Sequence, residues 1–550
     1  MVAEPDPAAS TELTDEQLER LRRFGQERPV AVGDVLFRPG DETYDFFAIL
    51  EGRVDIRLEI GIERAEVASH GPRRFLGELS MLTGQRVYLL AEVVEAGRVL
   101  VVPQADLRRV FSAEPELSDI VLRTFMARRQ TLQVGAGAHS LQLVGSRFSR
   151  ATTALRGFLV RAGVPHRFVD VEDVEESDAL LASFALSTDE TPVVITPTTV
   201  LRNPDPGELA EHLGLTFHAV PGHTFDLVVV GAGPAGLAAA VYGASEGLDT
   251  VVLEANDVGG QAGTSSRIEN YVGFPNGISG QDLSNRASVQ AMKFGAHITN
   301  PCRVVGFRPA SGWHVVELAD GSEVPTRALV VATGAAYRRP GVEGWERFEG
   351  AGIYYAATES EGQLCAGTRV AVLGGGNSAG QAALFLASKG CEVHVVLRSG
   401  DLGASMSRYL VDRIEADERI TVQRRTEVRA VHGDERLTGV TWERTADGRF
   451  DDVDVTGLFC FIGAVPSTSW VSRCLATDRA GFLLTDRDLG ADLPAVWTAV
   501  DRPPLPLETS EPGVFAAGDV RAGSVKRVAA AVGEGSTAVR SVHAHLAALD

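Results

Sequence analysis

The chain has 550 residues, more than one hydrophobic core supports, and a prior of roughly 150 residues per domain predicts three or four domains. It carries 73 acidic and 52 basic residues, which gives a formal net charge of -21. Such a charge repels phosphate backbones and anionic lipid, so we expect neither nucleic acid nor a membrane as a partner. We see no apolar run long enough to cross a bilayer and no signal peptide after Met1, and therefore expect a cytoplasmic protein.

The five cysteines lie far apart in the sequence, without a CxxC pair or a zinc-type cluster. We therefore predict no disulfide framework and no metal site. The cysteines are Cys302, Cys365, Cys391, Cys460 and Cys474.

The first part of the chain is predicted to form a β-roll that is closed by helices. Thr14 and Gln17 have the spacing of a capping box, which predicts a short helix. The short strand-like runs that follow are separated by turn residues such as Gly33 and Gly40. The stretch from Pro103 to about Gln133 is expected to be a helical hinge.

Within this β-roll, the stretch Phe75-Leu-Gly-Glu-Leu-Ser-Met-Leu-Thr-Gly-Gln-Arg-Val-Tyr88 resembles the phosphate-binding cassette of the cyclic nucleotide-binding domain family. The resemblance implies that Gly77 belongs to the binding loop, that Glu78 holds the ribose 2′-hydroxyl and that Arg86 holds the cyclic phosphate. The loop is shorter than the commonest cassettes, and Val87 replaces a small or hydroxyl residue. Two interpretations stay open, a site for cyclic AMP or cyclic GMP as effector, or a β-roll that has lost its ligand.

From Leu141 to about Leu215 the pattern is strand, helix, strand, helix, two short strands and helix, which resembles the thioredoxin and glutaredoxin fold. Thr191-Pro192 matches the turn in which that family has a cis proline. The position expected to carry Cys-x-x-Cys reads Arg147-Phe-Ser-Arg150, so no thiolate can form there. We therefore expect a packing or docking module.

A buried strand then runs through a glycine-rich turn into a helix. Gly231 allows the tight turn, Gly233 lets the backbone approach a pyrophosphate, and Gly236 lets the helix pack closely on its strand. The next strand ends on Glu254, whose carboxylate can accept a hydrogen bond from a ribose hydroxyl. These features predict a dinucleotide-binding fold.

From Thr224 to Asp550 the chain resembles low-molecular-weight thioredoxin reductase, which implies an FAD-dependent NADPH oxidoreductase. The matching motifs include Gly259-Gly-Gln261, Ile268-Glu-Asn-Tyr271 and Gly518-Asp-Val520. In that family the Gly-Asp-Val motif binds the ribityl and phosphate region of the flavin, and the helix after it covers the isoalloxazine. The FAD-binding residues that we expect are Gly231, Gly233, Pro234, Ala235, Gly236, Glu254, Gly260, Gln261, Asn270, Gly518, Asp519, Arg527 and Val528.

A second glycine turn again links a strand to a helix, and we assign Gly374, Gly376, Asn377 and Ser378 to NADPH binding. The strand after that helix ends on Arg398, and a guanidinium suits a 2′-phosphate better than a 2′-hydroxyl. We therefore expect NADPH rather than NADH. The alternative is that Arg398 is an ordinary solvated residue at the end of a strand.

These observations predict a multidomain fold. A β-roll with helices, of the cyclic nucleotide-binding type, occupies 1–138, and a thioredoxin-like α/β domain without CxxC occupies 139–219. Two Rossmann-like three-layer α/β domains follow, the FAD domain at 224–344 and 466–550, and the NADPH domain inserted into it at 345–465. The resemblance also implies a homodimer.

Thioredoxin reductases carry Cys-Ala-Thr-Cys just after the crossover into the NADPH domain. Here Ala356 and Glu359 replace the two cysteines, and a disulfide relay needs one thiolate to attack and a second thiol to resolve. We therefore predict no catalytic side chain. Hydride passes from NADPH to FAD, and electrons leave for a small-molecule or small-protein acceptor such as a quinone, a ferredoxin or flavodoxin, or dioxygen.

Two other functions stay open at this stage. One is a sensor in which the cofactors report redox state, or a cyclic nucleotide reports a second messenger, with little turnover. The other is a thioredoxin-disulfide reductase that uses other cysteines, with Cys365 acting together with a cysteine of its partner.

Overall fold

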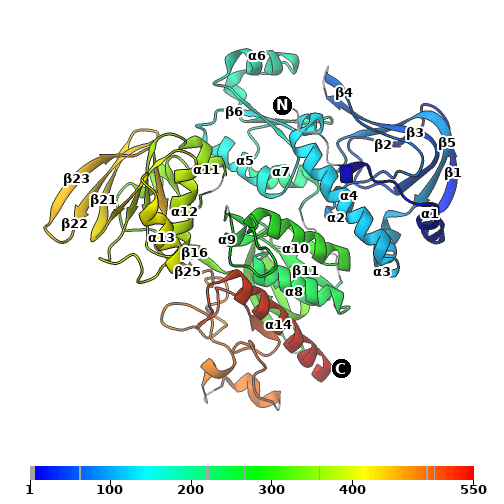
Figure 1. Cartoon of the computed structure of the whole chain (residues 1–550). Coiled ribbons are helices and arrows are strands. Elements are labelled where there is room, and N and C mark those ends of the chain that lie inside the picture. The colour runs from blue at the N-terminus through cyan, green and yellow to red at the C-terminus, as the bar shows by residue number, and fades with distance from the viewer. Residues whose placement is uncertain are drawn as a thin grey trace.

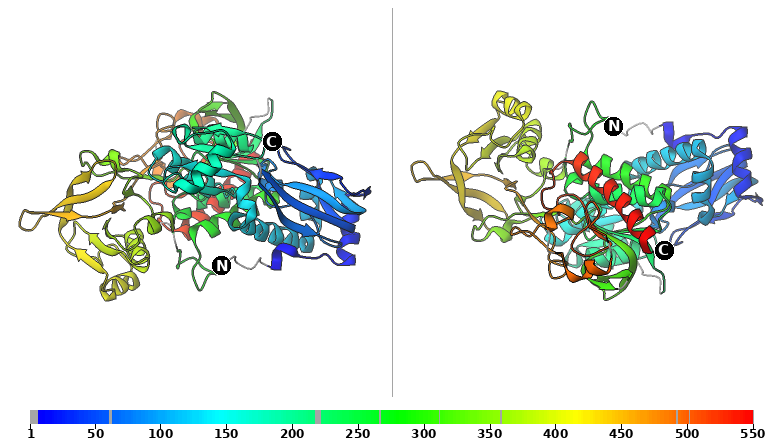
Figure 2. Two further views of the ribbon diagram at one scale, coloured as in Figure 1. Left: turned by 90° about the horizontal axis from the view of Figure 1, so that it is seen from above. Right: turned by 90° about the horizontal axis from the view of Figure 1, so that it is seen from below.

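The computed structural model describes residues 7–60, 63–216, 222–265, 267–310, 312–357, 359–490, 493–500 and 502–549. In three views the β-roll and the yellow unit around β21 to β23 lie at opposite ends of the molecule, and the small unit around β6 lies between them (Figures 1 and 2). The expected boundary after residue 219 lies outside the described residues. In the described ranges, no helix combines the length and the apolar composition needed to cross a membrane.

The first unit is an antiparallel β-roll with its helices. The side chain of Thr14 accepts a hydrogen bond from the backbone of Gln17, and the side chain of Gln17 accepts one from the backbone of Thr14, so the predicted capping box is confirmed. The sheet order is β1-β5-β3-β4, with β2 paired to β5. The elements are α1 (Asp15–Leu21), β1 (Gln26–Val30), β2 (Val35–Phe37), β3 (Phe46–Ile60), β4 (Glu63–His70), α2 (Ser80–Thr83), β5 (Leu90–Val102), α3 (Leu107–Ala113) and α4 (Pro115–Val134).

Helix α4 closes the β-roll by inserting an aromatic side chain into it. The ring of Phe125 is fully buried, and its centroid lies 6.4 Å from the ring centroids of Phe46 and Phe75. Three buried aromatic rings at this spacing give the first unit a core of its own. The prediction of a helical segment that closes this domain is confirmed.

The small unit has the predicted order of elements. Its sheet order is β7-β6-β8-β9, with β6 and β7 parallel and the other pairs antiparallel. The peptide bond Thr191–Pro192 is cis, as predicted. The elements are β6 (Gln142–Gly145), α5 (Arg150–Arg161), β7 (Arg167–Asp170), α6 (Val174–Ser183), β8 (Val193–Ile195), β9 (Val200–Arg202) and α7 (Pro206–Leu213).

The seven-stranded unit contains the first glycine turn. Its sheet order is β12-β11-β10-β15-β14-β13, with β26 parallel to β15. Helix α14 packs against α8, where a Cβ on Gly535 would lie only 2.1 Å from the carbonyl oxygen of Ala235. The elements are β10 (Phe225–Val230), α8 (Pro234–Ser245), β11 (Thr250–Leu253), α9 (Gly260–Gly263), α10 (Gly280–Phe294), β12 (His297–Thr299), β13 (Val304–Ala310), β14 (Trp313–Leu318), β15 (Glu323–Val331), β26 (Val514–Ala516) and α14 (Val528–Leu549).

The five-stranded unit contains the second glycine turn. Its parallel sheet has the order β17-β24-β18-β19-β20, beside a three-stranded antiparallel sheet of β21, β22 and β23. Strands β16 (Ala335–Tyr337) and β25 (Ala464–Pro466) pair where the chain enters and leaves this unit. The other elements are β17 (Ile353–Tyr354), α11 (Glu359–Leu364), β18 (Arg369–Leu373), α12 (Asn377–Ser388), β19 (Glu392–Val396), α13 (Arg408–Ala416), β20 (Ile420–Gln423), β21 (Thr426–Gly433), β22 (Leu437–Arg444), β23 (Arg449–Asp454) and β24 (Gly457–Cys460).

Candidate functional site

The two glycine turns open onto one cavity of about 1650 Å³. Each turn follows the carboxyl end of a parallel strand, which is where open α/β sheets bind their ligands. A shared cavity of this size can hold parts of two dinucleotides next to each other. The predicted residues that line it are Gly231, Gly233, Pro234, Ala235, Glu254, Gly260, Gln261, Gly374, Gly376, Asn377, Ser378, Arg398, Gly518, Asp519, Arg527 and Val528.

The first turn requires glycine for two different reasons. Gly231 has φ +104°, and a Cβ there would lie 2.5 Å from the carbonyl oxygen of Ala332. A Cβ on Gly236 would lie 1.8 Å from the carbonyl oxygen of Gly231, so this glycine packs behind the turn and does not line the cavity. Gly233 is the N-cap of α8, and the space beyond its missing Cβ is free for 4 Å. An anion can therefore approach the backbone at Gly233.

Glu254 fixes the first turn from the end of β11. Its carboxylate accepts hydrogen bonds from the backbone of Ala232 at 2.6 Å and of Asn256 at 2.8 Å. The side chain is 8% exposed, and burial raises its pKa. Glu254 therefore holds the loop as well as lining the cavity.

The loop after β26 is held by a second carboxylate. Glu534 of α14 accepts a hydrogen bond from the backbone of Gly518 at 2.7 Å and pairs with Arg521 at 2.6 Å. This arrangement leaves Asp519 at the cavity wall, and burial raises the pKa of its carboxyl.

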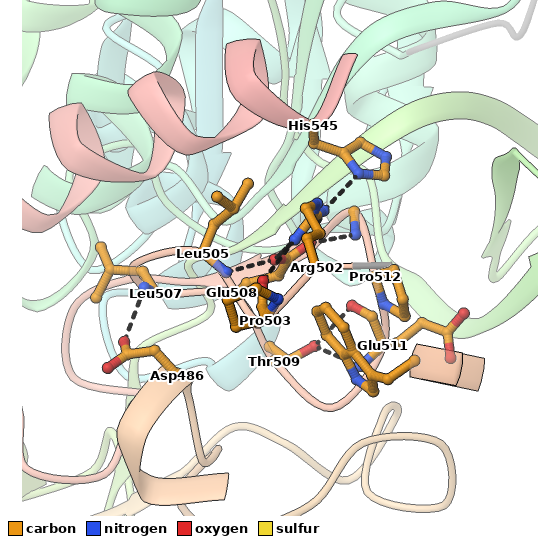
Figure 3. A network of polar contacts seen from close by, with 12 residues as sticks. Asp486, Arg502, Pro503, Leu505, Leu507, Glu508, Thr509, Glu511, Pro512 and His545 are labelled. Carbon is orange, nitrogen blue, oxygen red and sulfur yellow. Dashed lines mark hydrogen bonds and ion pairs between the residues drawn. The ribbon is translucent and has the colours of Figure 1, made fainter. Parts of the chain in front are cut away.

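A buried network anchors the segment that leads into β26 (Figure 3). Glu508 is 0% exposed and accepts hydrogen bonds from both Nη atoms of Arg502 at 2.7 and 2.9 Å. Its carboxylate also accepts from the backbones of Leu505 and Gly513, and Arg502 contacts His545 of α14 at 3.2 Å. All these groups fix the start of the strand that precedes Gly518.

The structure does not place Asn270 at the cavity wall, so its assignment as a cofactor ligand stays a prediction. The residue is exposed and does not line the cavity. The backbone bridge between Ile268 and Ile278 and an ion pair of 3.4 Å from Glu269 to Arg413 of α13 hold its loop outside. The motif Ile268–Tyr271 predicted a contact between Asn270 and the cofactor, and that contact depends on the position of the loop that carries Asn270.

The second turn repeats the geometry of the first. Gly374 has φ +138°, and a Cβ there would lie 2.3 Å from the carbonyl oxygen of Phe461. Gly376 is the N-cap of α12 and has free space beyond its missing Cβ. Arg398 is exposed where β19 ends, and no hydrogen bond or ion pair holds its side chain within the described part of the chain.

Sequence reasoning missed several residues of the cavity wall. Phe461 follows β24, and the rule that ligands bind at the carboxyl ends of parallel strands could have found it. No sequence signal marks the others, because they reach the cavity through tertiary packing. The missed residues include Cys302, Arg303, Tyr337, Ser405, Phe461 and Trp470.

Of the two positions that replace the missing dithiol, Ala356 lies apart from this cavity wall. Ala356 is half-buried and does not line the cavity, and Glu359 opens α11. The nearby thiol of Cys365 is 2% exposed, and burial raises its pKa to about 12. Cys391 is buried beside it and donates to its carbonyl oxygen at 3.1 Å. Both sulfurs are therefore kept as thiols away from solvent.

The predicted nucleotide cassette is held by contacts within the chain. Arg129 of α4 is 7% exposed and pairs with Glu78 at 2.8 Å. It also donates to the carbonyl oxygen of Gly163 in the small unit at 2.9 Å. Gly77 has φ +125° and accepts a hydrogen bond from Arg128 at 2.7 Å. The carboxylate predicted to hold a ribose thus already has a buried cationic partner.

Arg86 lies against the end of α7. Its backbone donates to the carbonyl oxygen of Leu213 at 3.0 Å, and a Cβ on Gly214 would lie 3.1 Å from its Cγ. The two predicted cassette residues therefore both contact other parts of the chain, Glu78 through α4 and Arg86 through the small unit.

Family models match two regions of the chain. The model described as pyridine nucleotide-disulphide oxidoreductase matches residues 225–535, and the model of the cyclic nucleotide-binding domain matches residues 27–114. The second match includes the cassette described above.

Curated relatives and solved structures match the same large region. A thioredoxin reductase from Listeria monocytogenes is 33% identical over 325 residues, which is 57% of this chain and 91% of that protein. An alkyl hydroperoxide reductase protein from Escherichia coli is 30% identical over 326 residues, which is 58% of each protein.

Among solved structures, thioredoxin reductase from Lactococcus lactis in its FR conformation has a TM-score of 0.53 at 27% identity, covering 59% of this chain and 99% of that one. The T. acidophilum thioredoxin reductase has a TM-score of 0.52 at 28% identity, covering 58% and 98%.

Proposed function

The chain belongs to the pyridine nucleotide-disulphide oxidoreductase family, and on that premise we propose that it passes electrons from NADPH through FAD to an acceptor without an internal dithiol. It is a thioredoxin reductase-like, FAD-dependent oxidoreductase with an N-terminal cyclic nucleotide-binding domain. FAD and NADPH are the cofactors that fit this family.

The shared cavity is the observation that supports the proposal most directly. Hydride transfer needs the two rings in contact, and both glycine turns open onto one space. FAD supplies the redox chemistry when it is bound, and the chain supplies binding and orientation. The free space at Gly233 and Gly376 fits the close approach of two pyrophosphates. On this proposal the predicted residues around the first turn hold FAD, and those around the second hold NADPH.

The thiol chemistry of this chain supports an acceptor that is not reached through cysteine. A thiol with a pKa of about 12 is almost entirely protonated at neutral pH, so Cys365 is a poor nucleophile. Its burial also keeps it from the cysteine of a partner protein. Both observations speak against a disulfide reductase that uses Cys365.

The experiment measures NADPH oxidation with a panel of acceptors. We expect a soluble quinone, a ferredoxin, a flavodoxin or dioxygen to support turnover, and thioredoxin and an aromatic disulfide to stay at background. The matched variant is Cys365→Ser, which should behave as the unmodified chain. Fast thioredoxin reduction that disappears in Cys365→Ser would overturn the proposal.

The domain boundaries are part of the same proposal. We assign 224–344 with 466–550 to the FAD domain and 345–465 to an inserted NADPH domain, since the chain leaves the seven-stranded sheet after β15 and returns to it at β26. We assign 139–219 to a thioredoxin-like domain without CxxC, which the order of its elements and the cis Thr191–Pro192 bond support. The first domain then spans 1–138, and the homodimer remains a prediction.

The small unit connects the cassette to the NADPH domain, and we propose that it transmits regulation. On the cassette side, Gly163 and Leu213 accept hydrogen bonds from Arg129 and Arg86. On the other side, the loop Arg147–Arg150 docks on the NADPH domain. Arg150 donates to the carbonyl oxygen of Glu346 at 3.1 Å.

A stacking contact strengthens this docking. The guanidinium of Arg436 lies 4.7 Å from the ring centroid of Phe148, which stands in the loop where the family fold has its redox pair. A cyclic nucleotide whose ribose bound Glu78 would compete with Arg129 for the same carboxylate. Nucleotide binding would therefore change the contact of Arg129 with Gly163. The nucleotide shifts the conformational equilibrium of the enzyme only as far as it binds one conformation more tightly than the other.

A further inference from the structure

A second arginine stands beside the end of strand β19, in the turn between β20 and β21. Arg425 has φ +52°, a backbone conformation that is uncommon for a residue with a side chain. Its backbone N–H donates to the carbonyl oxygen of Ser399 at 3.1 Å, and its carbonyl oxygen accepts from the backbone of Thr445 at 2.8 Å. The surrounding chain therefore fixes this arginine in an unfavourable conformation, which is often found at functional sites.

The guanidinium of Arg425 lies over the loop that follows Arg398. A Cβ built on Gly400 would lie 3.2 Å from Nε of Arg425 and 3.6 Å from its Nη2. Arg398 and Ser399, which directly precede Gly400, line the cofactor cavity. The Arg425 guanidinium thus lies against Gly400, in the loop that carries the cavity-lining residues Arg398 and Ser399.

Neither guanidinium has an acidic partner in the described ranges, whereas arginines nearby do. Both Arg398 and Arg425 are exposed, and no hydrogen bond or ion pair of their side chains is found there. By contrast, Arg424 pairs with Glu415 at 3.3 Å, and Arg408 pairs with Asp412 at 2.9 Å. The carboxylate of Asp401, in the same loop, accepts from the backbone of Gly403 at 2.9 Å.

We propose that Arg425 is a specificity-determining residue that binds the 2′-phosphate of NADPH together with Arg398. The inference rests on the proposed binding of NADPH at the second glycine turn. A dianionic phosphate between two guanidiniums forms charge-assisted hydrogen bonds with both, whereas the 2′-hydroxyl of NADH offers no charge to pair. The missing side chain of Gly400 leaves room for the Arg425 guanidinium beside this loop.

The test compares binding of 2′,5′-ADP and 5′-AMP to the FAD-loaded protein by calorimetry, because the two probes differ by the 2′-phosphate alone. The variant is Arg425→Asn, since asparagine tolerates a positive φ and leaves the turn unstrained. The matched control is Arg424→Asn, the neighbour that pairs with Glu415.

We expect Arg425→Asn to weaken the binding of 2′,5′-ADP at least tenfold and to leave the affinity for 5′-AMP unchanged. Arg424→Asn should change neither affinity. In turnover, KM for NADPH should rise with kcat preserved, and the kinetics with NADH should not change. If the unmodified protein prefers 2′,5′-ADP and Arg425→Asn keeps that preference, the role of Arg425 is wrong and NADPH binding stands. If the unmodified protein does not distinguish the probes, the NADPH preference itself fails.

Discussion

The space around Gly233 makes it the residue at which flavin binding can be tested without disturbing the fold. Its φ of -72° suits any residue, and a Cβ there meets nothing within 4 Å. We expect Gly233→Val to fold and to lose most of its FAD, because the side chain enters the space of the pyrophosphate. The ratio of flavin to protein absorbance measures this. Gly71→Val, a glycine of the β-roll with equally free space, should keep its flavin.

His70 makes the stability of the β-roll depend on pH. It is 4% exposed, and burial, with Arg128 and Arg74 nearby, lowers its pKa to about 3 from the ordinary 6.5. Because the folded pKa is depressed, this group favours folding above pH 6.5, and that stability is lost as the pH falls through 6.5 toward 3. At about pH 5 the loss is about 2 kcal/mol.

Calorimetric unfolding should therefore show a β-roll transition at a lower temperature at about pH 5 than at neutral pH. The variant His70→Leu, which cannot titrate, should show a smaller difference. An identical difference in both proteins would mean that other groups cause the pH dependence.

At the scale of elements, the buried pair of Arg502 and Glu508 holds the segment that leads into β26. Removing one partner of a buried ion pair costs about 3–5 kcal/mol, because the other charge stays buried and unpaired. We expect Glu508→Ala to lower the melting temperature and to release FAD, since β26 precedes Gly518. The exposed pair of Arg308 and Glu323 is the control. Glu323→Ala should lower the free energy of unfolding by at most about 1 kcal/mol. Equal effects of the two variants would contradict the anchoring role.

Sequence patterns predicted the elements whose causes are local. The capping box at Thr14, the turns at Gly231 and Gly374 and the order of elements in the small unit all follow from residues that are close in sequence. Strand ends also predicted where Arg398 would lie, because β19 fixes its position at the carboxyl edge of a sheet.

The features that sequence could not predict depend on packing between distant segments. Arg129 reaches Glu78 because α4 packs against the β-roll, and the Arg425 guanidinium lies beside Gly400, which is distant in the sequence. Asn270 was assigned by its motif, but contacts of its loop keep it outside the cavity. In each case one residue's role is set by a neighbour far away in the chain.

At the scale of the whole molecule, the small unit is predicted to couple the cassette to the reductase. We expect cyclic AMP or cyclic GMP to bind and to change the rate of NADPH oxidation, and Arg86→Ala to weaken binding at least tenfold, about 1.4 kcal/mol. The double variant Phe148→Ala with Arg150→Ala should bind the nucleotide normally but lose the change in rate, because it removes the docking on the NADPH domain.

The control for this coupling is Val160→Ala, an exposed position on α5 of the same unit. It should keep both the binding and the response. A response that survives loss of Phe148 and Arg150 would show that the signal takes another path. If calorimetry detects no heat of binding with either nucleotide, the cassette does not bind a cyclic nucleotide. The ion pair of Glu78 with Arg129 would then explain the loss of binding.

The central claim, electron transfer without a dithiol, is tested most directly by rapid-mixing spectroscopy of the bound flavin. The enzyme is first reduced with one equivalent of NADPH and then mixed with a quinone or with oxidised thioredoxin. We predict that the quinone reoxidises the flavin rapidly and thioredoxin does not, with the same rates in the variant Cys365→Ser with Cys474→Ser, which removes the exposed thiol as well. Rapid reoxidation by thioredoxin that this variant abolishes would contradict the account.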